Sequence, residues 1–164
     1  MLEGGIADKR GNDYEASWAL IEALRVLRGL ADEIRLEPYN EDAQGFEFRI
    51  TAEGVEEWHQ CKRQTSNGSW TIANLTSSGV LQAFAGKLTD PASLCVFVSS
   101  DPAPALEKLI EKALIAETAD DFLGEGGIGK GDRTALSDLA KAWPIDEATQ
   151  FDWLKRCRVE VTSH

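Results

Sequence analysis

Three polar side chains lie in two neighbouring segments, at spacings that suit the hydrolysis of a phosphodiester bond. Glu47 lies in one segment, and Gln60 and Lys62 lie two residues apart in the next. Side chains two apart on a β-strand share a face, so this pair can meet Glu47 across a hairpin. The carboxylate, the Gln60 amide oxygen and the Cys61 backbone carbonyl are suitable ligands for a hard divalent cation. The Lys62 ammonium can hold the attacking water or stabilise charge developing on phosphate.

Two predicted strands position these side chains. Residues 45–50 alternate between apolar and polar, and residues 55–63 form the expected hairpin partner after a short turn. In the second strand we expect Gln60 and Lys62 to point one way, and His59, Cys61 and Arg63 to point the other way. In the first strand we expect Phe46, Phe48 and Ile50 on one face and Glu47 and Arg49 on the other.

The remaining periodic segments predict helices on both sides of these strands. The first helix is expected at 12–30, capped by Asn12 or Asp13, and its apolar stripe comprises Trp18, Ile21 (or Leu20), Leu24 and Leu27. Further helices are expected at 72–88, 105–117, 133–143 and 146–156, and further strands at 34–38, 94–98 and 157–162. This order predicts an α/β sandwich in which helices flank a central mixed sheet, as one domain of 164 residues.

The tripeptide Gln60-Cys61-Lys62 resembles the Q-x-K variant of the PD-(D/E)xK nuclease superfamily, in its Mrr-type restriction-endonuclease branch. The likeness is closer to the N-terminal nuclease of bacterial antiphage effectors, including cyclic-oligonucleotide-activated (CBASS) systems and some large defence ATPases. Those modules open with a Gly-rich segment and a Tyr-Glu start to the first helix, matched here by residues 4–7 and 11–15. The likeness covers about the first 65 residues well, and the remainder only in element order.

The resemblance implies a restriction-endonuclease-like fold and a magnesium site, with Mn²⁺ as a substitute ion. Glu15 matches the helix carboxylate of that site, Glu47 the acid of the second strand, and Gln60 and Lys62 the signature. The family commonly has Asp where this chain has Glu47. Asp42 is the nearest aspartate and the alternative ligand, but the apolar–acid–apolar pattern favours Glu47. The implied substrate is double-stranded DNA, cut with little sequence demand.

The net charge of the chain affects how well such a domain can bind DNA. The chain carries 17 basic and 28 acidic residues, so its net charge is 17 − 28 = −11, and we expect it to bind DNA poorly by itself. We therefore expect activity to depend on homo-oligomerisation through a sensor or ATPase domain that follows this N-terminal module. Residues 58–89 contain no acid, and their side chains can hold phosphate or form a solvated turn. The expected DNA contacts are Arg63, Gln64, Trp70 and Lys87, with Trp70 stacking on a base.

Several other functions fit less well. No segment resembles a secretory signal or a membrane span, so we expect a cytoplasmic protein. The three cysteines are dispersed, and a half-buried strand face explains His59 and Cys61 better than a metal site does. Residues 124–131 resemble a Walker A loop, but Gly131 replaces the hydroxyl that ligates Mg²⁺. The alternatives to a nuclease are a nucleotide-binding regulator that uses this loop, and an inactive nuclease-fold interaction module.

Overall fold

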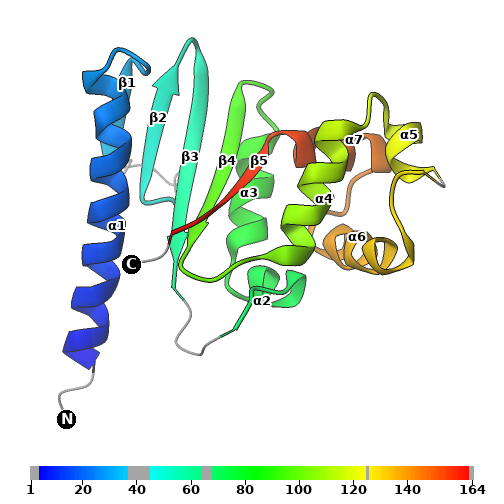
Figure 1. The fold of residues 1–164 in the computed structure, drawn as a ribbon, viewed down its shortest axis with the longest axis horizontal. Helices are drawn as coiled ribbons and strands as arrows, with labels where there is room; N and C mark the ends of the chain where they lie inside the picture. The colour runs from blue at the N-terminus through cyan, green and yellow to red at the C-terminus, as the bar shows by residue number, and fades with distance from the viewer. Residues whose placement is uncertain (1–3, 37–44, 64–67, 125, 163–164) are drawn as a thin grey trace.

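A five-stranded mixed sheet runs through the centre of the molecule (Figure 1). The computed structural model describes residues 4–36, 45–63, 68–124 and 126–162, with side chains from Tyr14 onward. The strands lie in sequence order; β1 to β3 pair antiparallel, and β3 to β5 pair parallel. Their bounds are β1 (Glu33–Leu36), β2 (Phe48–Ala52), β3 (Val55–Lys62), β4 (Ser93–Ser99) and β5 (Cys157–Val161). The expected α/β class with a mixed sheet is confirmed.

Helices cover both faces of this sheet. Figure 1 shows α1 beside the antiparallel half, while the other helices gather on the opposite side. Among the described helices, none combines the length and the apolar character needed to cross a membrane. The bounds are α1 (Gly4–Leu27), α2 (Ile72–Ser77), α3 (Val80–Leu88), α4 (Pro104–Ile115), α5 (Ala119–Leu123), α6 (Lys130–Ala142) and α7 (Glu147–Lys155).

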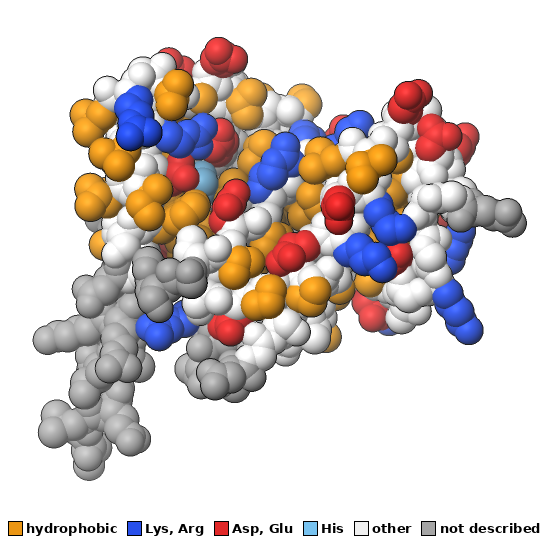
Figure 2. Space-filling view, in the orientation of Figure 1, with side chains coloured by type: hydrophobic (Ala, Val, Ile, Leu, Met, Phe, Trp, Pro, Cys, Tyr) orange, Lys and Arg blue, Asp and Glu red, His pale blue; other side chains and the backbone are white. Residues whose placement is uncertain are grey.

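The alternation of side chains along the strands separates two apolar cores. In β4, Val96 and Val98 pack on the α1 side, whereas Cys95 and Phe97 pack against the helices of the other side. The α1-side core is small, and hydrophobic side chains remain exposed over this helix in Figure 2. They include three residues that the sequence pattern assigned to a buried stripe, namely Ile21, Leu24 and Leu27. The prediction was right for Trp18 and wrong for these three residues, because α1 packs through the face that carries Tyr14, Trp18 and Glu22.

The two strands of the candidate hairpin follow the predicted facing with one exception. His59 and Cys61 lie on the α1 side, and Gln60 and Lys62 face α3, as expected. Phe46 was expected to share a face with Phe48, but it packs on the α3 side against Trp58 and Phe84. The reason is a bend at residues 45–47, before β2 begins, where Gly45 has a positive φ of 92°.

The helices differ from the predictions in three ways: one begins earlier, one is divided in two, and one was not predicted. The helix α1 begins at Gly4, so residues 12 and 13 lie within it and do not cap its start. The helix expected at 72–88 is two helices, because Gly79 adopts a left-handed conformation (φ 80°) between α2 and α3. The sequence analysis missed α5, whose capping box is formed by Thr118 and Asp121.

Arg156 fixes the end of α3 to the parallel half of the sheet. Its guanidinium donates to the carbonyl oxygens of Leu88 (2.7 Å), Asp90 (2.8 Å) and Ser93 (3.1 Å), and it pairs with Asp152 (2.7 Å). Carbonyls at a helix end have no partner inside the helix, so a side chain that bonds them holds the helix in place. Arg156 therefore sets the position of α3 opposite β3.

We predict that Arg156→Met lowers the free energy of unfolding by about 2–3 kcal/mol, because several charge-assisted hydrogen bonds are lost together. Urea denaturation followed by circular dichroism measures this change. Arg35→Met is the matched control, since Arg35 is exposed and forms only a surface pair with Glu33 among the described residues; its cost should stay below about 1 kcal/mol. Equal losses for the two variants would contradict the assigned role of Arg156.

Candidate functional site

Glu47 lies at the end of the β2–β3 ladder, where its side chain continues the hydrogen bonding between the strands. Its backbone N–H donates to the His59 carbonyl oxygen (3.0 Å), and its Oε2 accepts the backbone N–H of Cys61 (2.6 Å). Gly45 lets the backbone at this bend lie close to the Gln60 side chain, because a Cβ at position 45 would lie only 3.1 Å from Nε2 of Gln60. The bend that moved Phe46 to the other face thus also directs the Glu47 carboxylate to the backbone of β3.

Lys62 contacts the same carboxylate. Its Nζ lies 3.3 Å from Oε1 of Glu47, and the lysine side chain is 31% exposed against 18% for the glutamate. The ion pair is therefore open to solvent on the lysine side. A half-buried carboxylate beside an accessible ammonium is an arrangement that can bind a cation and an anionic oxygen at adjacent points.

Glu15 adds a second carboxylate from α1. The hydroxyl of its neighbour Tyr14 accepts a hydrogen bond from Thr162 (2.8 Å), which fixes this part of α1 against the end of β5. Burial raises the pKa of Glu47, and the negative charge of Glu15 adds to the rise, whereas Lys62 and the Cys61 N–H oppose it. The repulsion that Glu15 exerts on the ionised form of Glu47 would be offset by a divalent cation between the two acids.

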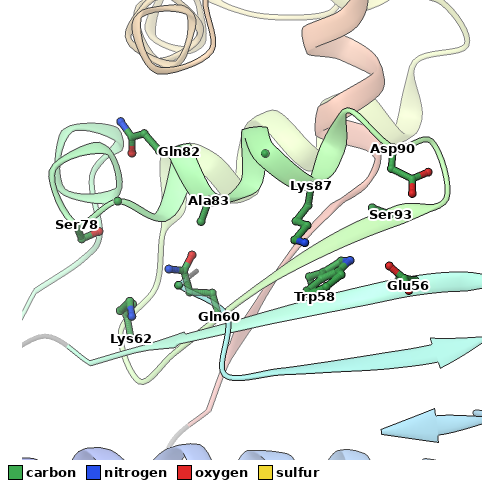
Figure 3. Close-up of a pocket in the computed structure, with 13 residues that line it drawn as sticks. Glu56, Trp58, Gln60, Lys62, Ser78, Gln82, Ala83, Lys87, Asp90 and Ser93 are labelled. Carbon is green, nitrogen blue, oxygen red and sulfur yellow. The ribbon is translucent and has the colours of Figure 1, made fainter. Parts of the chain in front are cut away.

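Gln60 supplies a buried acceptor. Its side chain is 2% exposed, and its Oε1 has no hydrogen-bond partner among the described residues. Figure 3 shows Gln60 and Lys62 pointing from β3 into a cavity below α3. An unpaired buried acceptor costs about 1–3 kcal/mol unless a ligand or water satisfies it. An amide oxygen such as that of Gln60 and carboxylates such as those of Glu47 and Glu15 are the types of donor that Mg²⁺ and Mn²⁺ prefer.

The structure allows some of the predicted DNA contacts to be checked, and it fits them to different degrees. Arg63 is exposed, and Lys87 lies over the Trp58 ring with its Nζ 3.6 Å from the ring centroid. Trp70 is buried, donates to Oγ of Ser99 (2.7 Å) and packs edge-on against Phe97, so its ring does not fit the expected stacking role. The two remaining residues, Gln64 and Asp42, lie outside the described residues.

A second cluster of possible metal ligands lies on the α1 face, and the sequence analysis missed it. Ligand atoms of Glu22, Glu57 and His59 lie within 4.8 Å of one another, and Figure 2 shows the histidine beside acidic and basic side chains. The Arg25 guanidinium already joins the two carboxylates, at 2.9 Å from Glu22 and at 2.6 and 2.8 Å from Glu57. No sequence motif signals this cluster, because Arg25 and Glu57 are 32 positions apart.

The imidazole of His59 also favours an ion-pair network over a metal centre. Its Nδ1 accepts a hydrogen bond from Nε1 of Trp18 (3.2 Å), so the neutral ring carries its proton on Nε2. That Nε2 faces Glu57 at 3.6 Å and therefore has no lone pair to offer a metal. Burial raises the pKa of the neighbouring Cys61 thiol, which keeps it protonated and unsuited to a shared His59–Cys61 site.

The loop at residues 124–131 lacks the features of a phosphate-binding loop. It follows α5 rather than a strand, and the first helical turn of α6 is capped by Asp132, which accepts the Gly129 N–H (3.1 Å). Asp132 also pairs with Lys108 (2.8 Å), and Lys112 donates to the Gly127 carbonyl oxygen. A carboxylate thus occupies the position that a nucleotide phosphate would need. Gly127 serves packing, since a Cβ at this residue would collide with the backbone of α5.

No known protein family, curated protein or solved structure matches the chain. The likeness to the PD-(D/E)xK nucleases therefore depends on the motif residues and their spacing. What the structure adds is independent of that likeness: Glu47 and Lys62 are in contact, the charge of Glu15 acts on the same carboxylate, and Gln60 is buried on the α3 face of β3, two residues before Lys62.

The Arg25–Glu57 pair makes the stability of the protein depend on pH. Hydrogen bonds from Arg25 lower the pKa of Glu57 to about 2 from its ordinary 4.5, with a smaller contribution from His59. An acid whose pKa falls on folding stabilises the protein above its unfolded pKa, and this contribution disappears as the pH falls from about 4.5 to 2.

We predict that Arg25→Met is clearly less stable than the natural protein near neutral pH, and that the gap narrows when both are measured at pH about 3. Urea titrations at the two pH values provide the measurement. Arg28→Met is the control, because Arg28 is an exposed arginine on the segment that follows the same helix. If the difference in unfolding free energy between the natural protein and Arg25→Met were the same at both pH values, the stabilising effect of Arg25 would not depend on the Glu57 carboxylate.

Proposed function

We propose that this chain is a metal-dependent DNA endonuclease domain that hydrolyses phosphodiester bonds, of the kind that its PD-(D/E)xK-like motif implies. The observation that supports the proposal best is the junction at the end of β3. There the Glu47 carboxylate is bonded to the Cys61 N–H and contacts Lys62. Two residues before Lys62, the buried oxygen of Gln60 has no hydrogen-bond partner among the described residues. A structural surface pair needs neither the buried acceptor nor the second acid, Glu15.

The proposed metal ligands are Glu15, Glu47 and Gln60, and the ion is Mg²⁺ or Mn²⁺. When bound, the ion supplies a nucleophilic water and neutralises charge on the phosphate. The Cys61 N–H holds Glu47 in place, and the buried position of Gln60 restricts its amide. Lys62 is the accessible cation, and it stabilises the negative charge that develops on the phosphate oxygens.

Double-stranded DNA is the proposed substrate, and bacterial antiphage defence is the proposed setting; both rest on the family resemblance. The net charge of −11 opposes DNA binding by a single copy. We propose that assembly into an oligomer, through a domain outside this chain, brings several copies onto one duplex and so raises the effective affinity.

We predict that Lys62→Ala lowers the rate of Mg²⁺-dependent plasmid cleavage about 100- to 1,000-fold, because the cation that faces the phosphate is lost. The assay compares nicked and linear products over time, in Mg²⁺ and in EDTA. Lys141→Ala is the matched control, because Lys141 is a highly exposed lysine paired only with Asp138 among the described residues. Cleavage that survives in Lys62→Ala would contradict the proposed function. So would the absence of cleavage by the natural protein at concentrations high enough that DNA binding by a single copy is not limiting.

A second prediction concerns stability without metal. Because burial and Glu15 raise the pKa of Glu47, its ionised form destabilises the metal-free fold, increasingly as the pH rises above its ordinary value. Glu47→Gln should therefore raise the melting temperature by a few degrees in EDTA near neutral pH. Mg²⁺ should raise the melting temperature of the natural protein but not of this variant.

Glu33→Gln is the control for this measurement, because Glu33 is a half-exposed acid on the edge strand β1. Its melting temperature should respond to Mg²⁺ as the natural protein does. A Mg²⁺ response of Glu47→Gln as large as that of the control would exclude Glu47 as a ligand.

A further inference from the structure

The face of α1 that points away from the sheet exposes a stripe of large apolar side chains. The stripe consists of Leu20, Ile21, Leu24 and Leu27, whose exposed fractions range from 44% for Leu24 to 82% for Leu27. Residues three, four and seven apart lie on one face of a helix, so these side chains form a continuous surface. Figure 2 shows hydrophobic side chains gathered over this helix.

A Schellman motif at the end of α1 extends this stripe. The N–H of Leu30 donates to the Arg25 carbonyl oxygen (2.8 Å), and the N–H of Gly29 donates to that of Val26 (3.0 Å). Gly29 has the positive φ of 69° that the motif requires. The motif turns residue 30 back over the last helical turn, where the Leu30 side chain is 64% exposed. The α1 patch is defined here as Leu20, Ile21, Leu24, Leu27 and Leu30.

The α1 patch is large enough to form much of a stable interface. Its five side chains expose about as much surface as three leucines without neighbours, roughly 500 Å². The largest apolar patches of monomeric proteins measure about 300–600 Å², and each partner in a standard interface contributes about 800 Å². Small side chains with exposed surface, namely Ala16, Ser17 and Ala23, border the patch and add to the area that a partner can cover.

The charges of α1 favour a protein over a lipid surface as the partner. Between residues 16 and 27 the charged side chains are Glu22 and Arg25, which pair with each other at 2.9 Å. Arg25 also bonds Glu57 on β3, so this pair belongs to the contact between α1 and the sheet. A helix that lies on a membrane usually carries several basic residues beside its apolar face, and α1 does not have them in this range.

The spacing along α1 favours a second helix, and the simplest such helix is α1 of another copy. Ser17, Leu20, Leu24 and Leu27 follow each other at alternating steps of three and four residues, as in helices that pack side by side. A two-fold axis brings the same surface of a second copy onto this one. Because no charged side chain interrupts the patch, two copies can cover each other without burying an unpaired charge.

We propose that the α1 patch binds the α1 patch of a second copy of this chain, so that the domain forms a two-fold symmetric dimer through paired helices. The interface itself does not rest on the proposed nuclease function. Its consequence for the candidate site does: α1, which carries Glu15, is then held between its own sheet and the partner helix. This contact acts in addition to any assembly through a domain outside the chain.

The test is sedimentation equilibrium of the 164-residue chain in EDTA, at concentrations from about 1 to 200 µM. We expect a monomer–dimer equilibrium in this range, because the patch is smaller than a standard interface. Raising NaCl from about 0.05 to 0.5 M should favour the dimer, since salt screens the repulsion between two copies of charge −11. A monomer under all these conditions, or a dimer that dissociates as salt is added, would overturn the proposal.

Leu27→Lys locates the interface. It should weaken the dimer about 100-fold, because a symmetric dimer loses two buried leucines and gains two charges at the interface. Lysine also makes the chain less negative, so general repulsion between copies cannot explain the loss. Leu20→Lys should act in the same way. Both leucines are exposed in the single chain, so neither change removes a core contact, and circular dichroism checks the fold.

Ile115→Lys is the matched control. Ile115 is the last residue of α4 and is 76% exposed, so the change introduces the same charge at an equally accessible apolar position away from α1. Its dimer should have the dissociation constant of the natural protein. Equal dissociation constants for Leu27→Lys and Ile115→Lys would show that the dimer does not form through the α1 patch.

A lipid surface is the other occupant that the experiments distinguish. Vesicles of phosphatidylcholine and phosphatidylglycerol are pelleted with the natural chain and with Leu27→Lys. We expect both proteins to remain in the supernatant. Pelleting of the natural chain alone would assign the α1 patch to lipid and refute the dimer.

The failure of this inference is distinguishable from the failure of the nuclease proposal, because sedimentation needs neither a metal nor DNA. A dimer that depends on Leu27, without Mg²⁺-dependent cleavage, leaves the interface standing and removes the nuclease. Cleavage by a chain that stays monomeric in sedimentation removes the interface and leaves the nuclease.

Discussion

The hydrogen bond between the Cys61 backbone and the Glu47 carboxylate is the constraint on which the rest of the candidate site depends. Strand pairing ends at this point, and a side chain takes over the bonding of a backbone N–H. Because a buried N–H without a partner is costly, the carboxylate is held where the fold needs it. That same position brings its other oxygen to Lys62 and keeps the acid largely out of water. The Glu47 carboxylate thus forms a structural hydrogen bond with one oxygen and leaves the other as the proposed ligand for a cation.

The two faces of the sheet contribute different parts around this carboxylate. From the α1 face, Glu15 adds negative charge, and the Arg25–Glu57 pair holds the helix against β3. From the α3 face, Gln60 and Lys62 border a groove that small residues of α3 leave open. Two destabilising features, namely the raised pKa of the Glu47 carboxyl and the amide oxygen of Gln60 that has no partner among the described residues, belong to residues of this region. Proteins tolerate such costs where a ligand later offsets them.

Regular alternation and periodicity were enough to predict the order of the elements and the facing of Gln60 and Lys62, because a strand allows only two directions for a side chain. They failed where the backbone departs from regularity: a bend at Gly45 moved Phe46 to the other core, and a left-handed Gly79 divided one expected helix. The partners of Arg25 and Trp58 come from distant segments, which no local pattern can indicate. The burial of Trp70 does not fit its predicted role of stacking on a DNA base. Its polar neighbours in the sequence had suggested a surface loop.

The central claim is that a divalent cation binds between Glu47 and Gln60, and the most direct measurement is anomalous diffraction from crystals grown with Mn²⁺. The account predicts an anomalous peak at the end of β3, with oxygen atoms of both side chains among the ligands of the ion. A peak between Glu22, Glu57 and His59 with Arg25 displaced, or no peak next to Glu47, would contradict it.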